Sequence, residues 1–176
     1  MISNPKFPPK PKGNGNLTNR EILFGQSIPV IDRLKIMSEG DFETLTLEWI
    51  DGYLIEKYEL VEKFGGAGDK GRDVVAHIDI KSGIWENYQC KHYDHPLMPN
   101  EVYTELGKII YFSFIGDYNP PYKYYFVTPQ GVGAKLSDLL RNNDLLKQKL
   151  LNNWNVKCKT DISKTNEIPL DSALTA

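Results

Sequence analysis

Two short segments rich in β-branched and aromatic residues, 73–80 and 84–91, flank the tripeptide Lys81-Ser82-Gly83. Such segments favour strands, and three intervening residues that end in glycine suit a hairpin loop with the glycine in the left-handed conformation. A hairpin centred on Ser82 pairs residues whose numbers sum to 164, so it predicts Asp73 opposite Lys91. This pairing constrains the fold most, because it fixes two neighbouring strands and their register.

The alternation along both segments supports this hairpin. One face is apolar apart from Glu86, and the other face carries most of the polar side chains. The apolar face holds Val74, Ala76, Ile78, Ile80, Ile84, Tyr88 and Cys90. The other face holds Asp73, Val75, His77, Asp79, Trp85, Asn87, Gln89 and Lys91. A slip of one residue would mix the two sets, so we expect a core face and a polar face.

The remaining patterns predict an α/β fold, on the borderline with α+β, in which helices flank a central mixed sheet. The expected order is helix, three strands, helix, strand, helix. The elements are a helix over 41–51 with Asp41 as N-cap, a strand over 53–63, the hairpin, a helix over 99–115, a strand over 124–127 and a helix over 136–154. Gly52 is expected to end the first helix. The crossover helix predicts that the last strand runs parallel to its neighbour, and Asn142-Asn143 predicts a break in the last helix.

The length of 176 residues fits one domain with flanking segments. Residues 1–19 are rich in Pro, Lys, Gly and Asn and predict a flexible arm, and residues 20–155 form the expected domain. Residues 156–176 are expected to be a polar tail, which we also interpret as the possible start of a linker to a further domain.

Charge and cysteine content narrow the setting. The formal net charge of −2 gives no global basic signature, so a nucleic-acid surface would have to be a local patch. The two cysteines indicate a reducing cytoplasm rather than a disulfide scaffold. The sequence has no recognisable signal peptide or membrane span, so we expect a cytoplasmic protein without a membrane partner.

The glycine-rich loop at 65–71 leads into Asp73, and the hairpin brings Gln89 and Lys91 to the same face. A carboxylate, an amide oxygen and a lysine in this arrangement can hold a divalent cation and activate water against a phosphodiester. Each residue also has a structural alternative: Asp73 as a turn residue, Gln89 as a structural amide and Lys91 as a solvated lysine. Arg72 has two interpretations, a phosphate contact or an ion pair.

Two other kinds of site are disfavoured. His77, His92 and His95 lack the ligand spacing of a zinc site. The glycine loop lacks the Gly-Lys-Ser/Thr ending of a nucleotide-binding loop, and it opens a strand rather than a helix.

The strings Gly68-Asp69-Lys70-Gly71-Arg72-Asp73-Val74 and Tyr88-Gln89-Cys90-Lys91-His92-Tyr93 resemble the PD-(D/E)xK nuclease superfamily, and its Mrr-like branch most closely. The resemblance covers about residues 41–154 and implies a restriction-endonuclease-like core. Within the superfamily, these strings are similar to the nuclease domains of bacterial anti-phage effectors. Those include cyclic-oligonucleotide-activated nucleases and ABC-three-component proteins.

The sequence departs from the superfamily pattern at Gln89, where an acid is more usual. An amide oxygen can bind Mg²⁺ but brings no negative charge, so another carboxylate is needed. In the Mrr-like branch the first helix supplies a glutamate, and the resemblance assigns that role to Glu43. Glu48, a little over one turn further along, is the alternative.

By resemblance, Asp73, Gln89, the carbonyl of Cys90 and Glu43 hold Mg²⁺ or Mn²⁺, and Lys91 assists the attack on the phosphate. The implied partner is double-stranded DNA, cut to leave a 5′-phosphate and a 3′-hydroxyl. A homodimer or partner subunits of a defence system are also implied. The alternative function is an inactive nuclease-fold module for DNA binding or subunit assembly.

Overall fold

The computed structural model describes residues 23, 25, 28–66, 68–163 and 165–170. The chain divides into two units, Met1–Arg33 and Leu34–Ala176. The helix α2 (Val30–Lys35) spans the boundary between them, and the whole sheet belongs to the second unit. The predicted flexible arm, residues 1–19, lies outside the described residues.

The first helix of the second unit, α3, runs over Glu39–Tyr53 and is longer than predicted at both ends. Its N-cap is Ser38, whose Oγ accepts a hydrogen bond of 3.1 Å from the backbone N–H of Asp41, so the prediction of Asp41 as N-cap is wrong. The helix also continues through Gly52. Turns follow it, and β1 is therefore confined to Leu60–Lys63 instead of the predicted 53–63.

The predicted hairpin is present as β2 (Val74–Asp79) and β3 (Ile84–Cys90), but its predicted register is wrong by two residues. Val74 pairs with Tyr88, a sum of 162, so the ladder continued by one residue brings Asp73 opposite Gln89 rather than Lys91. Two local features cause the shift. The loop has four residues, 80–83, and an irregularity between His77 and Asp79 adds one more residue to β2. Because the total shift is even, side chains between Val74 and His77 and their partners on β3 keep their predicted faces, whereas Asp79 pairs with Ile84 of the opposite predicted face.

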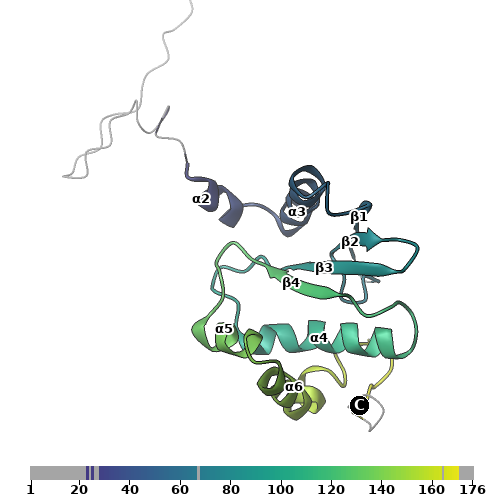
Figure 1. Cartoon of the computed structure of the whole chain (residues 1–176). Coiled ribbons are helices and arrows are strands. Elements are labelled where there is room, and N and C mark those ends of the chain that lie inside the picture. Colours follow the sequence, from purple (N-terminus) through teal and green to yellow (C-terminus); the bar gives the residue numbers. More distant parts are fainter. Residues whose placement is uncertain (1–22, 24, 26–27, 67, 164, 171–176) are drawn as a thin grey trace, which may run out of the picture. The chain divides into compact units, whose positions relative to one another are not determined.

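Helices cover both faces of the sheet (Figure 1). The face toward α3 forms a core cluster of Ile50, Tyr58, Val74, Ala76 and Tyr88. The other face is also buried, and Val75 and Trp85 pack against Ile109 of α4 (Pro99–Phe114). The predicted polar face is thus enclosed: Asn87 is 0% exposed and Gln89 is 3% exposed.

Glu86, the exception on the apolar face, has a local partner set. It is 1% exposed, and its Oε2 accepts hydrogen bonds from Tyr58 Oη (2.5 Å) and Lys57 Nζ (2.6 Å). Its Oε1 is buried without a partner among the described residues. The carboxylate is therefore held by the segment between α3 and β1, and it takes no part in the site described below.

The second half of the unit completes a four-stranded mixed sheet in the order β1-β2-β3-β4. After the crossover helix α4, β4 (Lys123–Val127) pairs with β3 in parallel, as predicted. The predicted break in the last helix is confirmed, because α5 (Ala134–Leu140) ends before α6 (Asn143–Lys157) begins. The fold is accordingly mixed α/β, with helices on both sides of the sheet.

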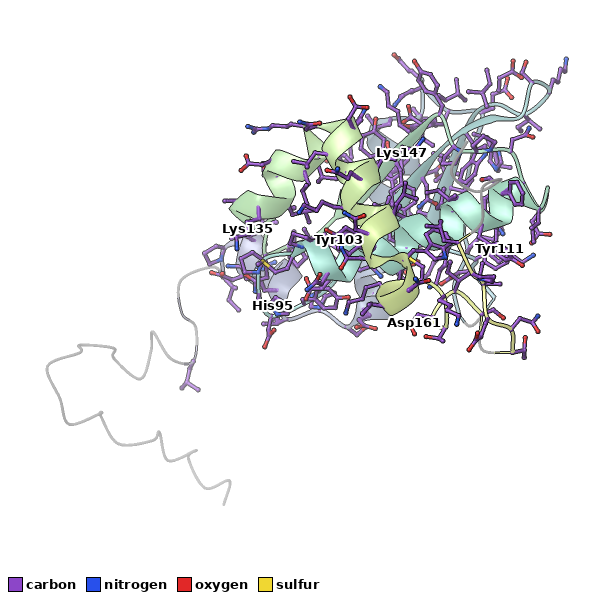
Figure 2. The ribbon with its side chains drawn as sticks, turned by 90° about the horizontal axis from the view of Figure 1, so that it is seen from below. His95, Tyr103, Tyr111, Lys135, Lys147 and Asp161 are labelled. Atoms are coloured by element: carbon purple, nitrogen blue, oxygen red, sulfur yellow. The ribbon has the colours of Figure 1, made fainter. Side chains whose placement is uncertain are left out.

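The segment after α6 is not the polar tail that the sequence predicted. Cys158, Ile162 and Ile168 are each at most 7% exposed and belong to the core cluster between α4 and α6. Figure 2 shows α6, which carries Lys147, lying over α4, which carries Tyr103 and Tyr111, with the segment around Asp161 following it. Described residues up to 170 are thus part of the domain, beyond its predicted end at 155.

Candidate functional site

The glycine-rich loop places Asp73 at the start of β2 by packing closely against α4. Gly71 has a φ of +84°, and a Cβ there would lie 3.0 Å from Cβ of Lys108 and would require a backbone conformation that L-residues avoid. Asp69 Oδ1 stabilises this turn by accepting a 2.9 Å hydrogen bond from the backbone N–H of Gly71. Asp69 is therefore a loop-stabilising residue as well as a neighbour of the site.

Asp73 is 6% exposed, and two donors from β3 hold one of its oxygens. Its Oδ2 accepts from Gln89 Nε2 at 2.6 Å and from the backbone N–H of Cys90 at 2.7 Å. Its Oδ1 has no hydrogen-bond partner among the described residues. Burial raises the pKa of Asp73 to about 7, although the Cys90 N–H and the charge of Lys91 pull the pKa down. The carboxylates of Glu43 and Asp69 add to the rise.

Gln89 lies between Asp73 and Tyr124 of β4. Its amide nitrogen faces Asp73, and its Oε1 accepts a 3.1 Å hydrogen bond from Tyr124 Oη. A hydroxyl can donate or accept, so Tyr124 is able to satisfy this amide in either orientation. The structure thus brings Asp73 and Gln89 together as predicted, with the nitrogen of the amide rather than its oxygen toward the acid.

Lys91 contacts an acid that the sequence interpretation did not include. Its Nζ lies 2.8 Å from Glu105 Oε1, and Lys108 Nζ lies 3.1 Å from the other carboxylate oxygen, Glu105 Oε2. Burial lowers the pKa of Lys91, but Glu105 more than offsets this, so the pKa of Lys91 is raised overall. Burial likewise raises the pKa of Glu105, and the two lysines outweigh it, so the pKa of Glu105 is lowered. Both side chains of the Lys91–Glu105 pair are therefore charged at neutral pH.

Asp73, Gln89, Lys91 and Glu105 line one cavity of about 180 Å³. The cavity is rich in acids and has one lysine in its lining. Its lining residues are Glu39, Glu43, Asp69, Asp73, Gln89, Cys90, Lys91, His92, Tyr93 and Glu105. Glu43 is among them and forms a 3.1 Å ion pair with Lys63, whereas Glu48 is exposed and does not line the cavity. Of the two glutamates considered from the sequence, Glu43 is the one that the fold brings near Asp73.

A larger cavity of about 470 Å³ lies between the glycine loop, α4 and the segment after α6. It shares Asp69 with the smaller cavity but contains neither Asp73 nor Lys91. The smaller cavity is the candidate site, because the reactive side chains converge there.

The acidic side chains of the small cavity suit the charge of a divalent cation, but their oxygen atoms are not arranged as a complete set of metal ligands. Asp73 Oδ1 is available, and the carbonyl of Cys90 points to the β2 side of the strand together with its N–H. Gln89 would bind a cation only with its amide turned so that Oε1 replaces Nε2, and Glu43 is paired with Lys63. Within the described ranges, no group of three or more His, Cys, Asp and Glu side chains is arranged to hold a metal ion.

Sequence reasoning missed Glu105 and Tyr124. Glu105 lies three residues after Val102 and four before Ile109, so it occupies a core-facing position of the α4 stripe, and a charged residue there is a signal of a buried partner. Tyr124 belongs to an aromatic run in β4 whose polar role has no sequence signal, because it depends on the pairing of β4 with β3.

None of the helices in the described part of the chain is both long and apolar enough to cross a membrane. A comparison of the chain with protein-family models, with curated proteins and with solved structures finds no match.

Proposed function

We propose that the chain is a metal-dependent endonuclease with a restriction-endonuclease-like fold that hydrolyses double-stranded DNA, as an effector of prokaryotic anti-phage defence. The observation that carries the proposal is the buried Asp73, whose pKa is raised to about 7 in a cavity that it shares with Gln89 and Lys91. A strongly perturbed acid beside a charged lysine in a cleft is typical of a catalytic site. The element order and the parallel β3–β4 pair support the proposed fold.

Each residue then has a defined task. Asp73, the carbonyl of Cys90 and Oε1 of Gln89 would hold Mg²⁺ or Mn²⁺, and Glu43, which also lines the cavity, would assist. The bound cation would supply a water of lowered pKa and would neutralise charge on the scissile phosphate. The protonated Lys91 would stabilise the negative charge that develops on the phosphate. Glu105 keeps Lys91 protonated and in position.

The same contacts favour a second function. Gln89 and Cys90 hold one carboxylate oxygen of Asp73, and Lys91 is paired with Glu105, so most polar groups of the cavity have protein partners without a cation. Such contacts are also compatible with an inactive nuclease-fold module for DNA binding or subunit assembly.

Plasmid nicking separates the two functions. Supercoiled DNA is incubated with the wild type and Mg²⁺ or Mn²⁺, with and without EDTA, and the nicked product is treated with DNA ligase. We expect cleavage only with the metal, and ligase should reseal the nicks because they carry 5′-phosphate and 3′-hydroxyl ends. Asp73→Ala and Lys91→Ala should each lower the rate by at least about a hundredfold.

A matched pair on α3 serves as control. Glu43→Gln should slow cleavage, whereas Glu48→Gln changes an exposed glutamate of the same helix outside the cavity and should not. Full activity of both Asp73→Ala and Lys91→Ala would disprove the proposed mechanism. Metal-independent DNA binding without cleavage by the wild type would favour the inactive module.

A further inference from the structure

Arg72, next to Asp73 in the chain, has its guanidinium in contact with two aromatic rings. Its Cζ lies 4.5 Å from the ring centroid of Phe64, just after β1, and 4.4 Å from that of Tyr118, in the turn after α4. Contact with two rings restricts the orientation of the guanidinium. Three separate segments of the chain thus cooperate to orient one cation.

Most N–H donors of the Arg72 side chain have no acceptor among the described residues. Its Nε donates to the backbone carbonyl of Asp69 at 3.1 Å, and among the described residues neither Nη nitrogen has an acceptor. The guanidinium has five N–H donors, so four remain for a ligand. The sequence left two interpretations of Arg72, a phosphate contact or an ion pair, and Arg72 forms no ion pair with the described residues.

The acids in its neighbourhood have other partners. Asp117 pairs with Lys70 at 2.6 Å, and Glu62 contacts His77 at 3.1 Å. Asp69, whose carbonyl accepts from Arg72, uses a carboxylate oxygen to hold Gly71. Among the described residues no acid thus pairs with the Nη groups of Arg72, which leaves them available for an external anion.

The position of Arg72 indicates which kind of anion it would bind. It lines a cavity of about 240 Å³ together with Phe64 and Tyr118, and this cavity is separate from the one that holds Asp73. The two cavities are neighbours, because Asp69 accepts from Arg72 with its carbonyl and lines the Asp73 cavity as well. A strand whose scissile phosphate lies at Asp73 would pass Arg72 with a flanking phosphate.

We propose that Arg72 binds a backbone phosphate of the DNA strand that flanks the scissile phosphate, an inference that rests on the proposed nuclease function. A planar guanidinium with a restricted orientation recognises two phosphate oxygens at once and loses little side-chain entropy when it binds. Arg72 thereby sets the register of the strand over Asp73, while the chemistry stays with the residues of the other cavity.

The test is duplex binding by the full chain as a function of salt, measured by fluorescence anisotropy with a labelled 30-base-pair DNA. It is carried out with EDTA and again with Ca²⁺, and each protein is kept well below its own melting temperature. One phosphate contact contributes a slope of about −0.9 to the plot of log affinity against log salt. Arg72→Gln should weaken binding roughly tenfold and reduce the magnitude of the slope by about one.

Two further variants make the result specific. Arg72→Lys keeps the charge but loses the planar fork, so it should keep the slope and bind with intermediate affinity. Lys123→Gln removes a cation that also lies over an aromatic ring, 5.6 Å from the centroid of Tyr122, but outside both cavities. It should bind as the wild type does.

The outcomes distinguish this inference from the proposed function. A wild type that binds and nicks DNA, together with an Arg72→Gln variant of unchanged affinity and slope, would overturn the role of Arg72 alone. A wild type that neither binds the duplex under either condition nor nicks plasmid would overturn both. A loss of slope in Arg72→Gln but not in Lys123→Gln supports the phosphate contact.

Discussion

Gln89 donates a 2.6 Å hydrogen bond from Nε2 to Oδ2 of Asp73, so a neutral amide shields the most deeply buried acid of the candidate site. An amide N–H satisfies one carboxylate oxygen but brings no positive charge to balance it. The Cys90 N–H and the charge of Lys91 compensate the burial of Asp73 only in part, so its pKa is raised to about 7. Two predictions follow from this pair, one for pH and one for divalent cations.

The pKa of Asp73 predicts how the stability of the domain depends on pH. The pKa is raised from 3.8 to about 7 on folding, so the protonated acid favours the folded state. This contribution is complete below about pH 4 and is lost as the pH rises through about 7. Asparagine does not titrate, so Asp73→Asn should not lose this contribution. In urea unfolding, the free energy of unfolding of the variant relative to that of the wild type should therefore rise between pH 5 and pH 8 by a few kcal/mol, since one pKa unit corresponds to about 1.4 kcal/mol. A difference that stays constant over this range would contradict the raised pKa.

Divalent cations should stabilise the protein through Asp73, independently of catalysis. At pH 8, saturating Mg²⁺ or Mn²⁺ should raise the melting temperature of the wild type by roughly 5–10 °C, as expected for a ligand at about a hundred times its dissociation constant. Asp73→Asn should respond much less. Gln89→Glu should be less stable than the wild type without metal, because two carboxylates then lie side by side, and it should gain more from the metal. Equal shifts in all three proteins would show that the cation binds elsewhere.

The sequence predicted the elements of this site better than their contacts. Alternation assigned the correct face to Val74, Ala76 and Tyr88, because a side-chain period of two survives any even shift of register. The register itself was missed, since the four-residue loop and the irregularity near Asp79 depend on local backbone geometry that composition does not encode. Asp73 and Gln89 still came together, although Lys91 was expected opposite Asp73.

The sequence did not predict the contacts that depend on tertiary packing. The enclosure of Asn87 and Gln89 follows from α4 lying over a face that looks polar in the sequence. Ile162 and Ile168 are buried in the core cluster that includes residues of α4 and α6, and the sequence did not predict this because isolated apolar residues in a polar segment show no periodicity. Glu105 was the one exception that left a signal, as an acid in the apolar stripe of α4.

The pairing of Lys91 with Glu105 should be visible in stability as well as in activity. Glu105→Gln leaves a buried ammonium group without its partner and should lower the free energy of unfolding by roughly 2–4 kcal/mol. This is somewhat less than for a fully buried pair, because each side chain keeps a little over a tenth of its surface exposed. Lys91→Met should cost less, since Glu105 retains Lys108. The double variant should be more stable than the sum of the two losses predicts, by about 1–3 kcal/mol in a double-mutant cycle.

The same variant tests the role of this pair in the proposed reaction. Glu105 raises the pKa of Lys91, so its removal should move the alkaline limb of the pH–rate profile to lower pH. A purely structural role for Glu105 would lower the rate equally at every pH.

The close contact between α4 and the segment after α6 gives a prediction about the domain boundary. A Cβ at Gly107 would lie 2.7 Å from Sγ of Cys158 and 3.2 Å from Cδ1 of Ile162. Gly107→Ala should therefore destabilise the domain by roughly 1–3 kcal/mol in urea unfolding, although alanine favours a helix by about 1 kcal/mol. Gly52→Ala is the matched control, since Gly52 lies within α3 with no atom within 4 Å of the added Cβ, and it should stabilise by about 0.5–1 kcal/mol. Stabilisation by both substitutions would mean that Cys158 and Ile162 do not pack on α4, and that the domain ends near residue 155 after all.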